Sequence, residues 1–383
     1  MSQILHHPVI SVSEITRPTF LEIDLNTLKE NFNRIRSFAS PAKIMTIVKA
    51  NAYGHGLIRV AQLYQEIGTD YFGVAVLEEG LLLRENGITK PVLVLGGILS
   101  DQIPLFIKND LTLTASSPSK LEQIDQIAEK LGIKAKVHLK IDTGMERIGV
   151  HYYSAGDFLN SAMKKKNIIV EGVYSHFANS ETKDLSYTKL QIERFEEALS
   201  FFTKNSIEMP LRHICNSGGI LQAPEAKYDM VRPGILLYGV YPGKEVKKSI
   251  IVKPAMNWKS RVVYFKVIKP EHPVGYGSTW QADHNIRAIT VPVGYGDGYF
   301  RKLSNRSCVI LNGKKYPEIG AVSMDQIVVN IENDSAYNSD EVILLGTDGK
   351  NTITCEEMAD WADTIPYEIL TNINTRVPRI YIG

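Results

Sequence analysis

Short apolar runs alternate with amphipathic stretches over the first two thirds of the chain. The apolar runs, rich in β-branched residues, are "KIMTIVK", "YFGVAV", "PVLVLGG", "LTLTAS", "AKVHLKID", "IIVEGVYSHF", "LRHICN" and "MVRPGILLYG". In "LNTLKENFNRIRSFA", "SKLEQIDQIAEKLG" and "YTKLQIERFEEALSFFTKN", apolar residues recur at helical spacing. This alternation predicts an α/β fold with an eight-stranded parallel (β/α)8 TIM-type barrel, although a doubly wound sheet would give similar local patterns.

The pattern changes after about residue 245. Long strand-like runs follow, namely "RVVYFKVI", "RAITVPVG", "IVVNI" and "EVILLG", with an Asn312-Gly313 hairpin signal and one clear helical stretch in "TCEEMADWA". We therefore predict two domains, the barrel over residues 1–245 and a C-terminal β-rich domain over residues 246–383. The stretch over residues 17–25 also indicates a strand, which we expect to join the second domain.

The composition is that of a folded protein with ordinary surface charge. Of the 383 residues, 44% are hydrophobic, which suffices for two cores. The 43 basic and 42 acidic residues leave a net charge of +1, without long blocks of like charge. Nucleic acids and anionic membranes are bound through clustered basic charge. We therefore expect neither as a partner.

The cysteines and the N-terminal stretch indicate the cellular compartment of the protein. Cys215, Cys308 and Cys355 are odd in number and far apart, so we expect no disulfide framework and no metal site. The opening "MSQILHHPVI" lacks a basic segment followed by an apolar one, and no run approaches about 18 apolar residues. These features predict a soluble cytoplasmic protein.

Polar residues follow five of the predicted barrel strands. They are Lys49, Lys140, His176, Asn216 with Ser217, and Arg232 with Gly234. In a (β/α)8 barrel the reactive groups lie at the carboxyl ends of the strands. A lone lysine or histidine there is most often a solvated or satisfied rim residue. Because these residues come from different strands and meet at one rim, a shared site is the better interpretation.

A series of motifs runs through nearly the whole chain. They are, in order, "VKANAYGHG", "KIDTGMERIGV", "YSHFANSE", "CNSGG", "MVRPGILLYG", "VGYGSTW", "VGYGDGY", "SMDQ" and "RVPRIY". Together they resemble the alanine racemases. The resemblance implies an enzyme that uses pyridoxal 5'-phosphate and interconverts L-alanine and D-alanine, supplying D-alanine for peptidoglycan. It also implies a head-to-tail homodimer with shared active sites.

Barrel residues match the cofactor site of this family. The resemblance gives Lys49 the covalent link to the cofactor and the role of one catalytic base. A reactive lysine must be a free amine, which burial favours by lowering its pKa. Arg232 matches the residue that faces the pyridine nitrogen, with His176 as its expected hydrogen-bond partner. The remaining matches to cofactor ligands are Tyr53, Asn216, Ser217, Gly234 and Ile235.

Racemisation needs proton transfer on both faces of Cα, so a second base must stand opposite Lys49. The resemblance assigns this role to Tyr276, delivered from the β-rich domain to the partner subunit. A phenol has an ordinary pKa of about 10 and needs a nearby cation to act as a base at neutral pH. Arg147 matches that cation. Lys140 matches a lysine that is N-carboxylated in many members and would then position Arg147.

The remaining matches lie in the β-rich domain. Met324 and Asp325 resemble residues that bind the substrate carboxylate together with Arg147, while Tyr295 and Arg301 resemble residues that line the entrance. Thr375 departs from the family pattern, because many relatives carry a tyrosine there. Without the tyrosine ring, the entrance to the active site would be wider. A serine or broad-specificity amino-acid racemase of the same fold is therefore the alternative function.

Overall fold

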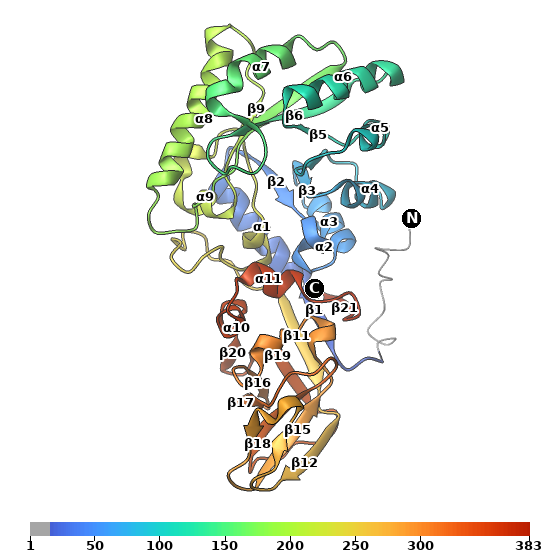
Figure 1. Cartoon of the computed structure of the whole chain (residues 1–383), viewed down its shortest axis with the longest axis vertical. Coiled ribbons are helices and arrows are strands. Elements are labelled where there is room, and N and C mark those ends of the chain that lie inside the picture. Colours follow the sequence, from blue (N-terminus) through green and yellow to red (C-terminus); the bar gives the residue numbers. More distant parts are fainter. Residues whose placement is uncertain (1–15) are drawn as a thin grey trace. The chain divides into compact units, whose positions relative to one another are not determined.

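Each apolar run predicted as a barrel strand contains a strand in the computed structural model, which describes residues 16–383 (Figure 1). These strands belong to a unit formed by Lys29–Ala52 and Leu57–Lys253, the barrel unit. They are β2 (Lys43–Ile47), β3 (Tyr71–Val74), β4 (Val92–Val94), β5 (Leu113–Ala115), β6 (Ala135–Asp142), β8 (Ile168–Tyr174), β9 (Leu211–His213) and β10 (Met230–Val231).

Parallel pairing closes these strands into a ring. One sheet has the strand order β10-β2-β3-β4, and the other has the path β5-β6-β8-β9. A parallel bridge between Leu93 and Thr112 joins β4 to β5. Backbone N–H of Arg232 donates to Cys215 O at 2.9 Å and joins β9 to β10. The predicted barrel is therefore confirmed and the doubly wound alternative excluded. A short extra strand, β7 (Val150–His151), pairs with the end of β6.

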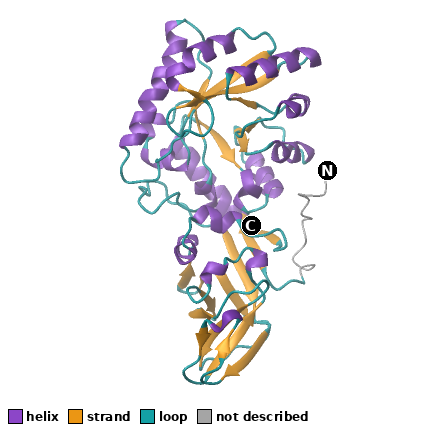
Figure 2. Ribbon diagram, in the orientation of Figure 1, coloured by secondary structure: helices purple, strands orange, loops and turns teal. Residues whose placement is uncertain are grey.

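Helices alternate with the barrel strands, as Figure 2 shows in purple. They are α1 (Leu25–Ala39), α2 (Lys49–Tyr53), α3 (Leu57–Glu66), α4 (Leu77–Glu85), α5 (Ile103–Lys108), α6 (Pro118–Leu131), α7 (Ala155–Met163), α8 (Ser186–Lys204) and α9 (Ser217–Gln222), with 3-10 turns η2 (Ser100–Gln102), η3 (Tyr152–Ser154), η4 (Pro224–Ala226) and η5 (Ile235–Tyr238). Capping residues explain where the helices begin and end, as α6 illustrates. The Ser117 hydroxyl accepts from Lys120 N–H at 3.1 Å and starts α6, and Gly132, with φ of 65°, ends it.

Strand β6 shows why the barrel can carry chemistry in its interior. Val137, Leu139 and Ile141 alternate with His138 and Lys140, and all five are buried. Side chains of successive residues point to opposite faces, so the apolar set packs on one side of the strand and the polar set on the other. Truncating Leu139 or Ile141 to Ala would cost about 2–5 kcal/mol of stability.

The other unit comprises the described residues up to Leu28, Tyr53–Gly56 and Pro254–Gly383, and we call it the β unit. Its sheet has the order β12-β15-β18-β17-β16-β19-β11-β1-β21, with β20 paired to β19. These strands are β1 (Phe20–Asp24), β11 (Met256–Arg261), β12 (Tyr264–Ile268), β15 (Ile286–Val291), β16 (Cys308–Leu311), β17 (Lys314–Ile319), β18 (Ile327–Glu332), β19 (Glu341–Asp348), β20 (Asn351–Ile353) and β21 (Arg379–Ile382); β13 (Pro273–Val274) pairs with β14 (Trp280–Gln281). Short turns are η6 (Tyr276–Ser278), η7 (Tyr295–Asp297) and η8 (Arg301–Leu303).

The β-rich character predicted for the C-terminal part is confirmed. Asn312 and Gly313, with φ of 50° and 71°, form the tight turn between β16 and β17. The N-terminal strand β1 pairs antiparallel with β11 and parallel with β21. No helix within residues 16–383 combines the length and apolar character needed to cross a membrane.

The prediction of a single C-terminal helix is wrong, because two are present. The predicted one is α10 (Cys355–Ala362), whose Thr354 hydroxyl accepts from Glu357 N–H at 3.1 Å. The second is α11 (Pro366–Thr371). At six residues it is too short for helical periodicity to appear, and the proline at its start masks it as a turn signal.

Candidate active site

The chain turns sharply after β2, and Lys49 stands at this turn. Ala50, Asn51 and Ala52 have φ of 52°, 55° and 52°, so α2 is a left-handed turn. The left-handed conformation costs an ordinary L-residue roughly 1–2 kcal/mol. Such strain persists only where surrounding contacts enforce it, and it concentrates at functional sites. The backbone that directly follows Lys49 is therefore held in a conformation that its residues do not favour on their own.

Glu79 on α4 supplies much of that enforcement, and it is not among the site residues predicted from the sequence. Its carboxylate oxygens accept from the backbone N–H of Ala50 at 2.6 Å and of Ala75 at 2.8 Å. The Asn51 side-chain oxygen accepts from Leu57 N–H at 2.8 Å. The available signal was an acid within the largely apolar stretch "VAVLEEGLLL", where a carboxylate that becomes buried requires a partner.

The environment of Lys49 favours its neutral amine. Burial is the main cause that lowers the pKa of this amine, and the cations Arg147 and Arg232 lower it further, against a smaller opposing effect of Glu79. A lysine with a lowered pKa loses its proton closer to neutral pH. Lys49 is thus suited to act as a nucleophile or a proton acceptor.

The guanidinium of Arg232 is buried inside the barrel unit. Nη1 donates to His213 Nδ1 at 2.7 Å, while Nη2 donates to Ser175 O at 2.7 Å, to Ile214 O at 3.0 Å and to His176 Nδ1 at 3.2 Å. The contact with His176 expected from the sequence is present. His213, the closer imidazole, was missed, although it lies in the predicted strand "LRHICN".

Arg232 also fits a ring nitrogen that accepts a hydrogen bond. Its Nε–H and one Nη1–H have no acceptor among the residues that the structure describes. A guanidinium offers only donors. Burial lowers the pKa of Arg232 to about 10, so the group stays charged at neutral pH. These observations fit a pyridine nitrogen placed at the open edge of the guanidinium.

The matches to phosphate ligands converge after β9 and β10. The Asn216 side-chain oxygen accepts from Gly219 N–H at 2.9 Å and caps α9. The Ser217 hydroxyl accepts from Gly234 N–H at 2.9 Å, which brings the two segments together just before Ile235. A Cβ on Gly218 would lie 2.7 Å from Ser180 O. Gly218 is therefore required by its close packing against Ser180.

Lys140 is the second lysine at the rim, and it is almost fully buried. Burial lowers its pKa to about 7, with further lowering by Arg232 and Arg147 and an opposing effect of Asp142. Its Nζ lies 4.8 Å from the centroid of the Tyr174 ring. A lowered pKa makes the neutral amine, the form that reacts with electrophiles, more accessible near neutral pH.

Tyr276 lies at the tip of the β13–β14 hairpin and is 73% exposed in the single chain. Gly275 and Gly277 flank it with φ of 71° and 74°. A Cβ on Gly275 would lie 3.2 Å from Ala321 N, so the glycine also permits close packing of the hairpin. The phenol is therefore presented outward from a defined backbone, where a second chain can reach it.

The loops that carry Tyr295 and Met324 are tied to each other. Tyr295 N–H donates to Ser323 O at 3.0 Å, and Gly296 N–H donates to Met324 O at 2.9 Å. The side chains of Tyr295 and Met324 are exposed. The structure thus brings the loop of one entrance candidate and the loop of one substrate candidate together.

Arg376 links Asp325 to a buried carboxylate. Its Nη2 donates to Asp325 Oδ1 at 2.5 Å, and its Nε lies 2.7 Å from Oδ1 of Asp297, which is fully buried. The adjacent Thr375 is exposed, and its hydroxyl donates to Asn374 Oδ1 at 3.2 Å. The small side chain of Thr375 therefore lies beside an ion-pair network that fixes Asp325.

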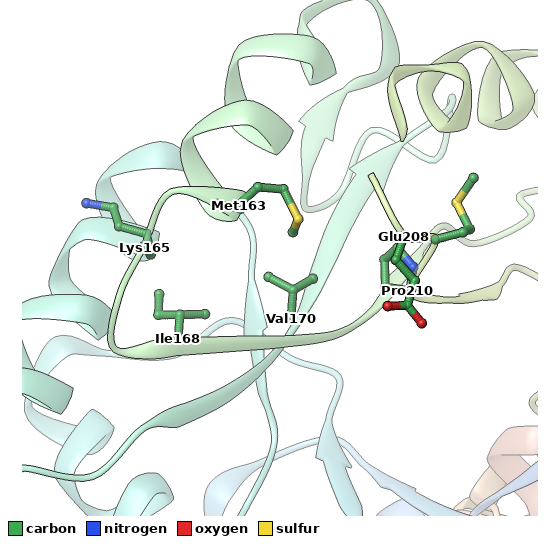
Figure 3. Close-up of a pocket in the computed structure, with 8 residues that line it drawn as sticks. Met163, Lys165, Ile168, Val170, Glu208 and Pro210 are labelled. Carbon is green, nitrogen blue, oxygen red and sulfur yellow. The ribbon is translucent and has the colours of Figure 1, made fainter. Parts of the chain in front are cut away.

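The candidate residues are divided between the two units. The barrel unit holds Lys49, Lys140, Arg147, His176, Asn216, Ser217, Arg232, Gly234 and Ile235, and the β unit holds Tyr53, Tyr276, Tyr295, Arg301, Met324, Asp325 and Thr375. The barrel group lies at the carboxyl ends of the strands. Figure 3 shows a hollow at the opposite, amino end of β8, lined by Met163, Ile168, Val170, Glu208 and Pro210. None of the candidate residues lines it.

Fold and site together define the class: a (β/α)8 barrel enzyme with a lysine of lowered pKa after its first barrel strand, β2, and a β unit in the same chain. The chain belongs to the alanine racemase family. The N-terminal domain of alanine racemase matches residues 23–242, and the C-terminal domain matches residues 255–381. The resemblance stated from the motifs is therefore confirmed, and the protein is an isomerase of this family.

Individual alanine racemases are similar to this chain over nearly its whole length. The alanine racemase of Carboxydothermus hydrogenoformans is 44% identical over 96% of this chain and 100% of its own length. The solved alanine racemase of Clostridium difficile 630 has a TM-score of 0.91 at 36% identity, covering 96% of both chains. That of Bartonella henselae, with covalently bound pyridoxal phosphate, has a TM-score of 0.87 at 28% identity, covering 95% of this chain and 99% of the other.

Proposed function

We propose that this protein interconverts L-alanine and D-alanine with pyridoxal 5'-phosphate as cofactor, and that it supplies D-alanine for peptidoglycan in the cytoplasm. The observation that carries the proposal is Lys49, an amine of lowered pKa after β2 in a chain of the alanine racemase family. When bound, pyridoxal phosphate supplies an electron sink that acidifies the Cα–H bond of an amino acid.

The proposed cofactor ligands are the residues that match the cofactor site of the family. Lys49 would hold the cofactor covalently, and Arg232 would face the ring nitrogen with its open edge. The other proposed ligands are Tyr53, His176, Asn216, Ser217, Gly234 and Ile235. Arg232 offers the ring nitrogen donors but gives up a proton reluctantly. This limits electron withdrawal by the ring and favours return of the proton to Cα.

Two bases would move the Cα proton. Lys49 would take or return it on one face, and Tyr276 of the partner subunit on the other. Arg147 would stabilise the deprotonated phenol and, with Met324 and Asp325, bind the substrate carboxylate. Tyr295 and Arg301 would line the entrance. The outward position of Tyr276 supports its delivery to another chain.

Lys140 would be N-carboxylated. Its neutral amine would attack the carbon of CO2, forming an N–C bond and releasing one proton, so that a cation becomes an anion able to position Arg147. The lowered pKa of Lys140 supports this reaction. Protein equilibrated with ¹³C-bicarbonate should show one carbamate ¹³C resonance. It should vanish in Lys140→Met but persist in Lys136→Met, a partly exposed lysine of the same strand. A resonance retained in Lys140→Met would place the modification elsewhere.

The proposed homodimer would share its active sites between subunits. Mixed Lys49→Ala and Tyr276→Ala chains form heterodimers in which one of the two sites has both bases. Random exchange should restore about a quarter of the wild-type activity, since half of the dimers are mixed and each has one intact site. Each variant alone is the control. No recovery after demonstrated subunit exchange would mean that each site is built within one chain.

A serine or broad-specificity racemase is the second candidate, and Thr375 is the observation that favours it. Its side chain is smaller than the tyrosine that the family resemblance implies at this position. Initial rates with alanine, serine, lysine and arginine, each starting from the L-isomer, test both candidates. The proposal expects kcat/KM for alanine to be the highest. Equal or higher values for serine would favour the alternative, and no racemisation by cofactor-loaded protein would refute both.

A further inference from the structure

A chain of hydrogen bonds leads away from Arg232 into the barrel interior. Arg232 Nη1 lies 2.7 Å from His213 Nδ1, and His213 Nε2 lies 2.7 Å from His138 Nδ1. Both imidazoles are fully buried. His138 Nε2 makes no hydrogen bond within the described residues, and an oxygen of the Glu171 carboxylate lies 4.0 Å from it. The chain thus ends on a buried polar atom that faces an acid.

The chemistry of Arg232 fixes the direction of this chain. A guanidinium has no acceptor, so His213 must accept at Nδ1. A neutral imidazole carries one proton, so that of His213 is on Nε2 and is donated to His138 Nδ1. His138 must in turn carry its proton on Nε2, the atom that faces Glu171. Each tautomer follows from the one before it.

The same geometry excludes protonation of either imidazole. A second proton on His138 would place N–H groups face to face across a 2.7 Å contact, and one on His213 would oppose the donor of Arg232. The ionisable groups around the pair are Arg232, directly after β10, Lys140 from β6, Glu171 and Tyr174 from β8, and Tyr71 from β3. Burial and Arg232 lower the pKa of both histidines, that of His138 to about 3.

We propose that His138 and Glu171 are positioning residues, which hold His213 in its Nε2–H tautomer and thereby keep Nδ1 available as the acceptor for Arg232. For catalysis the inference rests on the proposed function, because it concerns the residue that would face the cofactor ring. Glu171 is suited to end the chain. Its carboxylate attracts the partial positive charge of His138 Nε2–H. The Thr112 hydroxyl donates a hydrogen bond to Glu171 Oε2 at 3.0 Å and so fixes the carboxylate.

Neutron diffraction from deuterium-exchanged crystals of the holoenzyme tests the tautomers directly. We expect deuterium on Nε2 and none on Nδ1 of both His138 and His213. Deuterium on Nδ1 of either ring would overturn the proposal. This readout does not depend on racemisation, so a wild-type enzyme that fails to racemise alanine would refute the proposed function without deciding the tautomers.

Paired substitutions test the effect on catalysis. His138→Asn retains an acceptor close to the position of Nδ1, whereas His138→Leu fills the space without one. We expect His138→Leu to lower kcat about tenfold with KM for alanine within twofold, and His138→Asn to keep most of the wild-type kcat. Equal losses in both would indicate a packing role only and contradict the proposal.

Glu171 has its own pair of variants. Glu171→Leu should lower kcat about threefold, because it removes the charge that attracts His138 Nε2–H. Glu171→Gln, which keeps an acceptor oxygen, should recover part of that loss. Glu122→Gln, on the surface of α6, is the matched control and should change nothing. An unchanged kcat in Glu171→Leu would remove Glu171 from the chain.

Discussion

Replacing Lys49 by alanine should lower the racemisation of alanine by about 10³-fold or more, in both directions. The loss removes the group that would hold the cofactor and one of the two groups that would move the Cα proton. Initial rates from L-alanine and from D-alanine, with cofactor-saturated protein, measure it. Lys43→Ala is the matched control, because Lys43 is exposed at the amino end of the same strand and should be dispensable.

The attachment point can be mapped independently of the rates. Borohydride treatment of the holoenzyme followed by peptide mapping should place the reduced cofactor on Lys49. Lys140 is the natural competitor, because burial lowers the pKa of both amines. A label on Lys140, or near-normal racemisation in Lys49→Ala, would transfer the assignment from the first strand of the barrel to the fifth.

Hydrophobic periodicity predicted most of the fold, because it depends on which face of each element is buried. The stretch "LNTLKENFNRIRSFA" is α1 from Leu25 to Ala39, and "AKVHLKID" is β6 from Ala135 to Asp142. Both elements are long enough for the period to repeat. The short helix α11 escaped for the opposite reason. Alternation with helices then favoured the barrel, and only strand pairing could exclude the doubly wound sheet.

The turn at Lys49 could not be predicted from local sequence. No glycine occurs from Ala50 to Tyr53, so backbone preference alone argues against a left-handed turn. Contacts from elsewhere impose it, above all that of Glu79, which lies 29 residues from Ala50. Motif resemblance located Lys49, but the strained backbone that directly follows it is a property of the folded barrel.

The buried imidazoles illustrate the same limit. His213 and His138 are 75 residues apart in sequence and meet only because β6 and β9 both border β8. Each stands inside an apolar run, where a single histidine is most often a satisfied core residue. Their hydrogen-bond direction comes from Arg232, which directly follows a third strand, β10. Information of this kind is absent from any one segment and arises when the barrel closes.

The two proposed bases differ in their surroundings, and this difference makes their roles separable. Lys49 is partly buried among Glu79, Arg147 and Arg232 of its own barrel unit. Tyr276 is exposed at the tip of a hairpin. A change at Tyr276 should therefore leave the folding and cofactor binding of its own chain intact. Its effect should fall on one direction of proton transfer.

Replacing Tyr276 by phenylalanine should abolish racemisation while leaving half of the proton chemistry intact. The substitution removes the hydroxyl and keeps the ring, so substrate binding should largely survive. In the family resemblance, the lysine serves D-alanine and the tyrosine serves L-alanine. In heavy water, the variant should still exchange the α-proton of D-alanine through Lys49, whereas exchange from L-alanine should fall by about 10²–10⁴-fold.

Proton NMR of the α-position, followed separately from each isomer, measures this asymmetry. Tyr337→Phe, another exposed tyrosine of the β unit, should behave as wild type. Arg147→Ala should show a milder form of the same defect, because the deprotonated phenol would lose the cation that stabilises it. If Tyr276→Phe lost exchange equally from both isomers, or still racemised alanine at a near-normal rate, Tyr276 would not be the second base. The partner of Lys49 would then have to be sought elsewhere.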